Sequence, residues 1–88
     1  MQIINFTLYS RSYCHLCDDL LQALYSLQTE QLRFAVDVID VDADEALVAR
    51  FDELVPVLFG HLAQPELCHY FLDEKAVRRY LAAPSVFN

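Results

Sequence analysis

The 88-residue sequence predicts an α/β fold in which one mixed sheet of four strands is flanked by three helices. Three observations predict it. Apolar runs rich in β-branched and aromatic residues alternate along the chain with segments of helical periodicity. The hydrophobic content is 56%, which suffices for a compact core in a chain of this length. The sequence contains one glycine, three prolines and no internal repeat or linker, so we expect a single domain over residues 1–88.

The first half of the chain predicts a strand, a helix and a second strand. Residues 2–9 carry β-branched and aromatic side chains, with apolar groups on both faces, which is typical of a central strand. Residues 15–29 predict a helix with one buried face. Leucines recur there at helical spacing, namely Leu16, Leu20, Leu21, Leu24 and Leu27. Residues 33–41 predict a second strand, and a helix that crosses between two strands implies a right-handed unit with parallel strands.

The middle of the chain predicts a short helix and then a hairpin. Residues 46–51 have helical spacing of apolar groups, and either Asp42 or Asp44 is suited to be the N-cap. Residues 57–59 and 66–71 have strand composition and are separated by a segment of suitable length for a hairpin loop.

A last helix is predicted from Asp73 to Leu81, with acidic residues in its first turn, basic residues later and Pro84 as its stop. The predicted element order is βαβαββα. We expect the sheet order 2-1-3-4, with the first two strands parallel to each other, the last two antiparallel to them, and helices on both faces of the sheet.

Composition excludes several classes of function. Thirteen acidic residues against six basic ones give a formal net charge of −7, and a surface of this sign repels a nucleic-acid backbone. No apolar run approaches the roughly 20 residues that span a bilayer, and no charged leader precedes a hydrophobic stretch. We therefore expect a cytoplasmic protein with no membrane and no nucleic-acid partner. Three cysteines, an odd number, argue against a structural disulfide framework.

The most informative motif is Cys14-His15-Leu16-Cys17, which lies where the first strand gives way to the first helix. A C-x-x-C pair that opens a helix inside a βαβ unit is a thioredoxin-like redox signature. Free amide groups and the helix dipole stabilise a thiolate at that position. The competing interpretation is two inert core thiols. Because Cys14 falls on the turn before the leucine stripe, the redox interpretation is favoured.

The predicted mechanism assigns different roles to the two thiols. Cys14, at the edge of the helix, attacks a substrate disulfide, and Cys17, one turn further in, resolves the mixed disulfide. A cationic His15 favours the thiolate, whereas Asp18 and Asp19 oppose it, so the sign of the net effect stays open. The remaining thiol is Cys68, which we expect to be a small core hydrophobe, and the other histidines, His61 and His69, are expected to be structural or at the surface.

Two segments resemble glutaredoxins, and most closely the short bacterial glutaredoxin-like proteins. They are Tyr9-Ser10-Arg11 with the following Tyr13-Cys14-His15-Leu16-Cys17, and Leu54-Val55-Pro56-Val57-Leu58. The resemblance implies a thioredoxin-like fold and a dithiol thiol-disulfide oxidoreductase. It implies a cis Val55-Pro56 bond whose flanking backbone pairs with the substrate as an added strand.

The same resemblance implies contacts between the substrate and residues beside the dithiol. Arg11 is either a partner of a substrate carboxylate or a solvated surface charge. Tyr13 is either an apolar platform or a plain exposed residue, and His15 lies between the cysteines. With Val55 and Pro56, these residues complete the expected substrate-binding set.

Two departures from the glutaredoxin pattern leave the reductant open. His15-Leu16 replaces the usual Pro-Tyr between the cysteines, and Leu72-Asp73-Glu74 replaces a glycine pair followed by an acid. We expect no bound cofactor and no metal, with glutathione left open as a co-substrate. The expected partners are a protein or small-molecule disulfide and, as reductant, glutathione or a thioredoxin reductase, acting on a monomer.

Two other functions remain as alternatives. Cys14, His15 and Cys17 fall short of the four ligands of a closed zinc site, although a dimer that shares an iron–sulfur cluster would supply more. The second alternative is a thioredoxin-like interaction domain whose acidic surface binds a protein and whose dithiol does not turn over.

Overall fold

The structure is a computed structural model that describes residues 4–82, and its element order is the predicted βαβαββα with one added 3-10 turn. The elements are β1 (Ile4–Ser10), α1 (His15–Tyr25), β2 (Phe34–Asp40), η1 (Val41–Ala43), α2 (Glu45–Phe51), β3 (Val57–Phe59), β4 (Cys68–His69) and α3 (Glu74–Ala82). The start of the first predicted strand, residues 2 and 3, and the predicted stop at Pro84 lie outside the described residues. Within residues 4–82, no helix is long and apolar enough to cross a membrane.

The four strands form one mixed sheet in the predicted order, β2-β1-β3-β4. β1 pairs in parallel with β2, from Ile4 beside Phe34 to Ser10 beside Asp40, because α1 returns the chain to the same end of the sheet. β3 is antiparallel to β1, and β4 is antiparallel to β3. β4 therefore runs in the same direction as β1. The expectation that both late strands oppose the first pair was correct for β3 and wrong for β4, because the hairpin reverses the chain once more.

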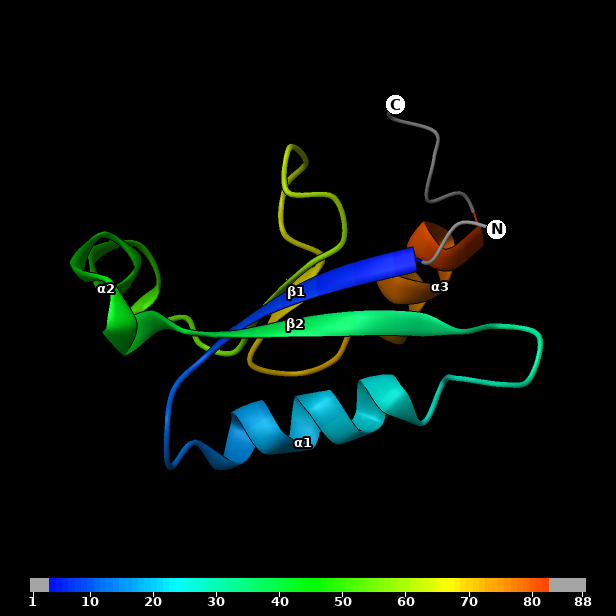
Figure 1. Ribbon diagram of the computed structural model, residues 1–88, viewed down its shortest axis with the longest axis horizontal. Coiled ribbons are helices and arrows are strands. Elements are labelled where there is room, and N and C mark those ends of the chain that lie inside the picture. Colours follow the sequence, from blue (N-terminus) through cyan, green and yellow to red (C-terminus); the bar gives the residue numbers. More distant parts are fainter. Residues whose placement is uncertain (1–3, 83–88) are drawn as a thin grey trace.

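β1 is the central strand, and its alternating side chains enter two separate cores. Phe6 and Leu8 pack on the face covered by α1 and α3. That core consists of Phe6, Leu8, Leu20, Leu24, Phe34, Leu58, Val77 and Leu81. Tyr9 points to the opposite face, where it stacks on Phe51 of α2 with ring centroids 4.5 Å apart. Helices thus cover both faces, as predicted, and Figure 1 shows α1 running alongside the strands while α2 lies at one end of the sheet.

Helix α1 is shorter than predicted, because it ends at Tyr25. Its buried residues are Cys17, Leu20 and Leu24, and Leu21 and Leu27 of the predicted stripe also pack against the core. Leu16 is 38% exposed, so its predicted place in the buried stripe was wrong. The physical reason is geometric. A repeat of four residues drifts by about 40° per step around a helix with 3.6 residues per turn, and the three-residue step from Cys17 to Leu20 corrects that drift.

The hairpin is also shorter than its sequence pattern. The predicted strand over 66–71 contains only two ladder residues, Cys68 and His69, and Tyr70 then adopts a left-handed backbone with φ of 64°. At the other end of the hairpin loop, a Cβ on Gly60 would lie 2.6 Å from the ring of Tyr80. That ring is held against Phe6 and by a 3.0 Å hydrogen bond from its hydroxyl to the Asn5 carbonyl, so only glycine fits this turn.

Candidate active site

The two cysteines of the C-x-x-C motif are joined as a disulfide at the start of α1. Cys14 is the N-cap of this helix, with an extended backbone, and its Cα lies 5.2 Å from that of Cys17. The Cys17 backbone N–H donates to the Cys14 sulfur across 3.1 Å. A side-chain acceptor at the N-cap satisfies one of the free amides of the first turn. The same amide and the helix dipole are placed to stabilise negative charge on this sulfur once the bond is reduced.

The two sulfurs differ in their access to solvent. Cys17 is 3% exposed because it occupies the first core position of α1, one turn before Leu20. Cys14 is partly exposed because the N-cap lies ahead of the packed face. Around it, His15, Leu16 and Asp18 are exposed. A molecule arriving from solvent therefore meets Cys14 before Cys17.

Tyr13 immediately precedes the dithiol and is fully exposed. Its backbone has φ of 58°, a left-handed conformation that is uncommon for a residue other than glycine. This conformation turns the chain from the end of β1 into the N-cap of α1. The Tyr13 side chain consequently extends into solvent beside Cys14.

The Val55–Pro56 peptide bond is cis, as the resemblance implies. In the antiparallel register of β1 and β3, Tyr9 lies beside Val57. Continuing that register places Pro56 level with Ser10 and Val55 level with Arg11, which leads into the dithiol. The Pro56 carbonyl accepts the Tyr70 N–H at 2.9 Å, and the Val55 N–H donates to the Phe51 carbonyl at 3.2 Å.

The Val55 carbonyl accepts no hydrogen bond from any residue between 4 and 82. Since the Val55 N–H is already used, this carbonyl is the group that remains for the predicted added strand. The structure thus brings the predicted site residues to one end of the sheet, where the parallel strands β1 and β2 end. They are Arg11, Tyr13, Cys14, His15, Cys17, Val55 and Pro56.

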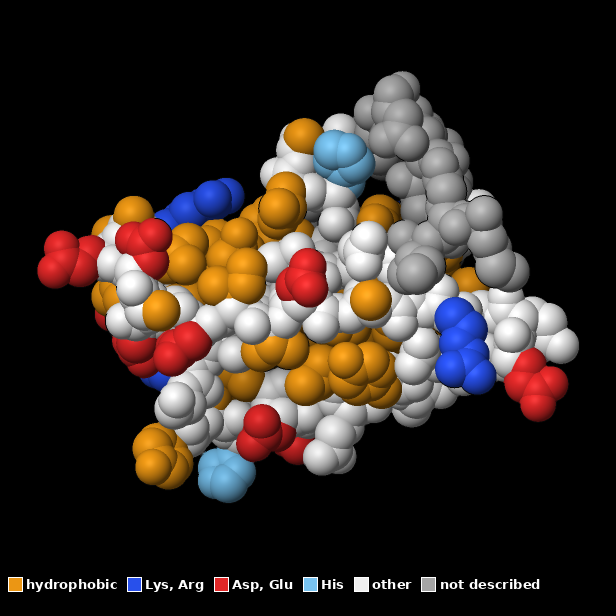
Figure 2. Space-filling view, in the orientation of Figure 1, with side chains coloured by type: hydrophobic (Ala, Val, Ile, Leu, Met, Phe, Trp, Pro, Cys, Tyr) orange, Lys and Arg blue, Asp and Glu red, His pale blue; other side chains and the backbone are white. Residues whose placement is uncertain are grey.

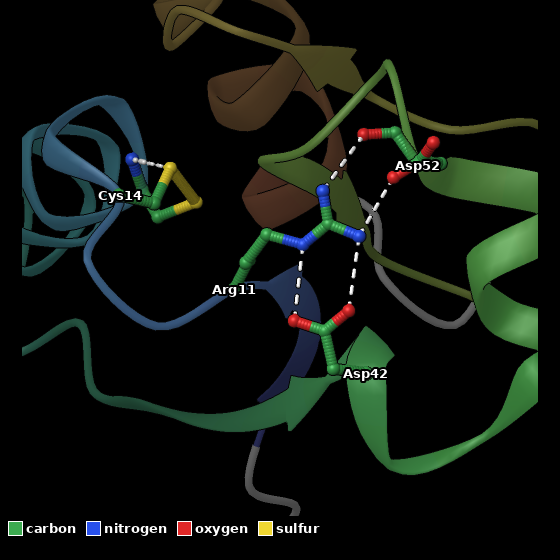
Figure 3. The surroundings of a disulfide bond; sticks show 5 residues. Arg11, Cys14, Asp42 and Asp52 are labelled. Atoms are coloured by element: carbon green, nitrogen blue, oxygen red, sulfur yellow. Dashed lines mark hydrogen bonds and ion pairs between the residues drawn. A yellow bond between two sulfur atoms is a disulfide. The ribbon is translucent and has the colours of Figure 1, made fainter.

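Arg11 is not a lone solvated charge. Its Nε and Nη2 donate to the two carboxylate oxygens of Asp42, each at 3.0 Å, and Nη2 also lies 2.7 Å from Asp52 Oδ1. A longer contact of 3.5 Å joins Nη1 to the Asp52 backbone carbonyl. These hydrogen bonds, first to Asp42 and then to Asp52, raise the pKa of Arg11. Figure 3 shows the guanidinium between the two carboxylates, with the disulfide close by.

Sequence reasoning missed the partners of Arg11. The sequence predicted Asp42 or Asp44 as the N-cap of the short helix; Asp44 is confirmed, and Asp42 pairs with Arg11 instead. Asp40 accepts the Asp42 N–H in η1, and Asp44 accepts the Ala46 N–H in α2. Asp42 and Asp52 are 31 and 41 residues from Arg11, and no local spacing links residues so far apart. The only available signal was the fold, which brings the ends of β1, β2 and α2 together.

The remaining candidate residues have partners other than the dithiol. Cys68 is partly buried and packs against the α1–α3 core, as expected of a small hydrophobe, and burial raises the pKa of its thiol. His69 lies 2.7 Å from Glu66, and His61 Nδ1 accepts the Ala63 N–H. Among residues 4–82, no group of three or more His, Cys, Asp or Glu side chains is arranged to hold a metal ion.

Comparison with solved structures finds the same fold in two bacterial proteins. The solution structure of protein Ne2328 from Nitrosomonas europaea is 36% identical, with a TM-score of 0.78, and the match covers 91% of this chain and 93% of that one. The X-ray structure of protein XcR50 from X. campestris is 31% identical, with a TM-score of 0.65, over 89% of this chain and 96% of that one. No curated protein matches the sequence.

The family comparison agrees with the fold and with the motif. Residues 5–82, which include the dithiol and the cis-proline, match the family model described as Glutaredoxin-like domain (DUF836). This match covers almost all of the sequence. The chain therefore belongs to the glutaredoxin-like domain family.

Proposed function

We propose that the protein is a thiol-disulfide oxidoreductase that uses Cys14 as nucleophile and Cys17 as resolving thiol. The observation that supports this proposal most directly is the asymmetry of the pair. One sulfur is accessible and accepts a backbone N–H at 3.1 Å, while the other is buried one turn further along the same helix. Disulfide exchange needs an accessible thiolate and a second thiol within bonding reach.

The reaction begins with the reduced dithiol. The Cys14 thiolate attacks one sulfur of a substrate disulfide, forming a Cys14–substrate bond and releasing the other substrate sulfur as a thiolate that takes up a proton. The Cys17 thiolate then attacks the Cys14 sulfur, and the second substrate thiol leaves. Two electrons have passed to the substrate, and the enzyme holds the Cys14–Cys17 bond seen in the structure. Two glutathione molecules, which leave as glutathione disulfide, or the dithiol of a thioredoxin reductase system, which leaves as an internal disulfide, regenerate the Cys14–Cys17 dithiol without a bound cofactor.

The substrate lies, in this proposal, between the dithiol and the cis-proline segment. An extended disulfide peptide donates one backbone N–H to the Val55 carbonyl and rests on Pro56, while Tyr13 and His15 flank the reacting sulfurs. A dithiol that must be re-reduced after each turnover suits a reducing compartment, so we place the protein in the cytoplasm as a monomer.

Trapping the mixed disulfide tests this proposal. Reduced Cys17→Ser protein mixed with 2-hydroxyethyl disulfide should retain one adduct on Cys14, detected by intact mass and peptide mapping. Wild-type protein should instead release both thiols and form the internal bond, and Cys68→Ser, the control, should behave as wild type. Failure of the wild type to reduce this disulfide, or to cycle its own bond, would favour an interaction domain without turnover. An adduct on Cys17 in the Cys14→Ser protein would reverse the two roles.

A further inference from the structure

Arg11 is a charged residue near the dithiol, and it has no role in the reaction proposed above. An arginine has five N–H donors on three nitrogens, and all three nitrogens of Arg11 have a partner. Nε and Nη2 donate to Asp42, Nη1 donates to the Asp52 carbonyl, and Nη2 also forms an ion pair with the Asp52 carboxylate. Two carboxylates share one guanidinium, so the three side chains together carry one negative charge. A substrate carboxylate at this position would have to displace an existing ion pair and would meet a net charge of its own sign.

The contacts of Arg11 join three segments that are distant in sequence. Arg11 begins the loop that presents Cys14, Asp42 lies in η1 immediately after β2, and Asp52 is the C-cap of α2. Asp52 also opens the loop that leads within three residues to Val55. Arg11 therefore links the loop of the nucleophile to the segment with the cis-proline.

The geometry of the pairing suits a fixed link. Asp42 is engaged by two parallel N–H groups, an arrangement that fixes the angle as well as the distance. A lysine in its place would offer a single point charge and could not reproduce the fork. Arg11, Asp42 and Asp52 have side-chain exposures of 31%, 49% and 53%, so water reaches all three. Exposed ion pairs add little to the free energy of unfolding, and the effect of this cluster is therefore to align the segments that it joins.

We propose that Arg11 is a positioning residue, which holds the Cys14 loop against the Val55–Pro56 segment through Asp42 and Asp52 and does not bind a substrate carboxylate. This inference rests on the proposed redox function. The substrates that it implies are disulfides that bind without a carboxylate contact to Arg11. An enzyme that used Arg11 to hold an anionic substrate would behave differently.

Two disulfides of similar size and different charge distinguish these roles. We would measure kcat/KM with neutral 2-hydroxyethyl disulfide and anionic 3,3′-dithiodipropionate for wild type, Arg11→Gln, Arg11→Lys and Asp42→Asn. A positioning role predicts that each variant loses about tenfold with the neutral disulfide, on which the altered charge acts least, since misplacement by 1 Å can cost up to a hundredfold. The Arg11→Gln/Asp42→Asn double variant should lose no more than the single variants. Asp37→Asn, which removes an exposed carboxylate on β2, is the charge-matched control and should keep wild-type rates with the neutral disulfide.

A second measurement separates alignment from activation of the thiolate. In the Cys17→Ser background, Arg11→Gln should slow formation of the mixed disulfide on Cys14 but leave alkylation of Cys14 by iodoacetamide unchanged, because this small reagent needs no docking. Equal slowing of both reactions would overturn the inference, since Arg11 would then act on the charge of the sulfur. Loss confined to the anionic disulfide would also overturn it and restore the carboxylate-binding role. Inactivity of the wild type with every disulfide would instead overturn the proposed function itself.

Discussion

Cys17 belongs both to the hydrophobic core and to the disulfide. It fills the first buried position of α1, ahead of Leu20 and Leu24, and its sulfur is bonded to that of Cys14. Burial restricts the direction from which Cys17 is attacked but leaves it free to attack its covalent neighbour. One helical turn of separation therefore gives two chemically identical side chains different exposure and, in the proposed reaction, different roles.

The difference in burial predicts the order in which the thiols are alkylated. In the fully reduced protein at pH 8, iodoacetamide should modify Cys14 first, while Cys17 and Cys68 lag. Cys17 is shielded by packing, and burial raises the pKa of Cys68, so less of that thiol is ionised at this pH. Timed quenching and peptide mass spectrometry measure the three rates, with Cys14→Ser as the control that should remove the fast phase. A fast phase on Cys17 would contradict the assignment.

At the level of single residues, the sequence predicted the cysteine pair and the cis-proline better than their surroundings. The C-x-x-C motif located the dithiol, and the resemblance located the cis-proline, because both are local patterns. The ion pairs of Arg11 were not predictable in this way, since Asp42 and Asp52 meet Arg11 only after three elements pack. The hydrogen bond from the Val55 N–H to the Phe51 carbonyl was equally unpredictable from the sequence, because it depends on how α2 ends.

Helix α1 shows what a periodic pattern does and does not determine. The leucine spacing correctly predicted a helix and its start, but the centre of its buried face is set by contacts with β1, β2 and α3 rather than by the repeat. In the structure Leu24 is fully buried, whereas Leu16 lies on the exposed side near the dithiol. The sequence alone made the two leucines equivalent.

Substituting these two leucines tests the register of α1. Leu24→Ala should lower the free energy of unfolding by about 2–5 kcal/mol, the usual cost of a cavity in a packed core. Leu16→Ala, the matched control on the same helix, should cost less than about 1 kcal/mol because its side chain remains partly in water. Urea titration of both variants, each with the Cys14–Cys17 bond formed, gives the comparison. Equal losses would place Leu16 in the core and refute the register.

The late strands illustrate the limit of composition as a guide to strand length. Residues 66–71 are mostly apolar or aromatic, yet only Cys68 and His69 pair with β3. Tyr70 leaves the strand with a left-handed backbone, its N–H bonds to Pro56 and its hydroxyl to the Glu53 carbonyl. This residue therefore supports the cis-proline segment instead of lengthening the sheet. Strand composition marks where pairing is favourable, whereas the contacts of the final fold decide where it stops.

At the scale of the whole molecule, exposed acidic side chains lie near the dithiol. Most basic side chains either have a partner already or lie far from the dithiol. Figure 2 shows acidic side chains gathered at the α2 end of the visible face. Exposed acids near this end include Asp18 and Asp19 on α1, and Asp44, Glu45 and Glu53 around α2. Arg11 is shared by two carboxylates, and the Arg50 guanidinium lies 4.6 Å from the centre of the Phe51 ring. Arg78, on α3, pairs with Glu74.

This charge distribution predicts a preference among small disulfides. With a net charge of −7, the protein should react fastest with dicationic cystamine, more slowly with neutral 2-hydroxyethyl disulfide and slowest with dianionic 3,3′-dithiodipropionate. We expect the extremes to differ by about tenfold at low ionic strength, after each rate is divided by that of the same disulfide with dithiothreitol. Raising the salt concentration should compress the series, because the screening length falls to about 3 Å at 1 M.

Two variants locate the source of this preference. Asp18→Asn/Asp19→Asn removes charge within the first two turns of α1 and should narrow the ratio of cystamine to 3,3′-dithiodipropionate. Glu30→Gln removes a charge from the loop that leads into the start of β2, at the opposite end of that strand from η1, and should leave the ratio close to wild type. Screening weakens each charge with distance, so a local field predicts a change in the ratio for the α1 variant alone. A uniform net charge predicts changes in proportion to the charges removed, two for the α1 variant and one for Glu30→Gln. A ratio that is insensitive to salt and to both variants would mean that substrate choice depends on contacts at Tyr13, Val55 and Pro56 alone.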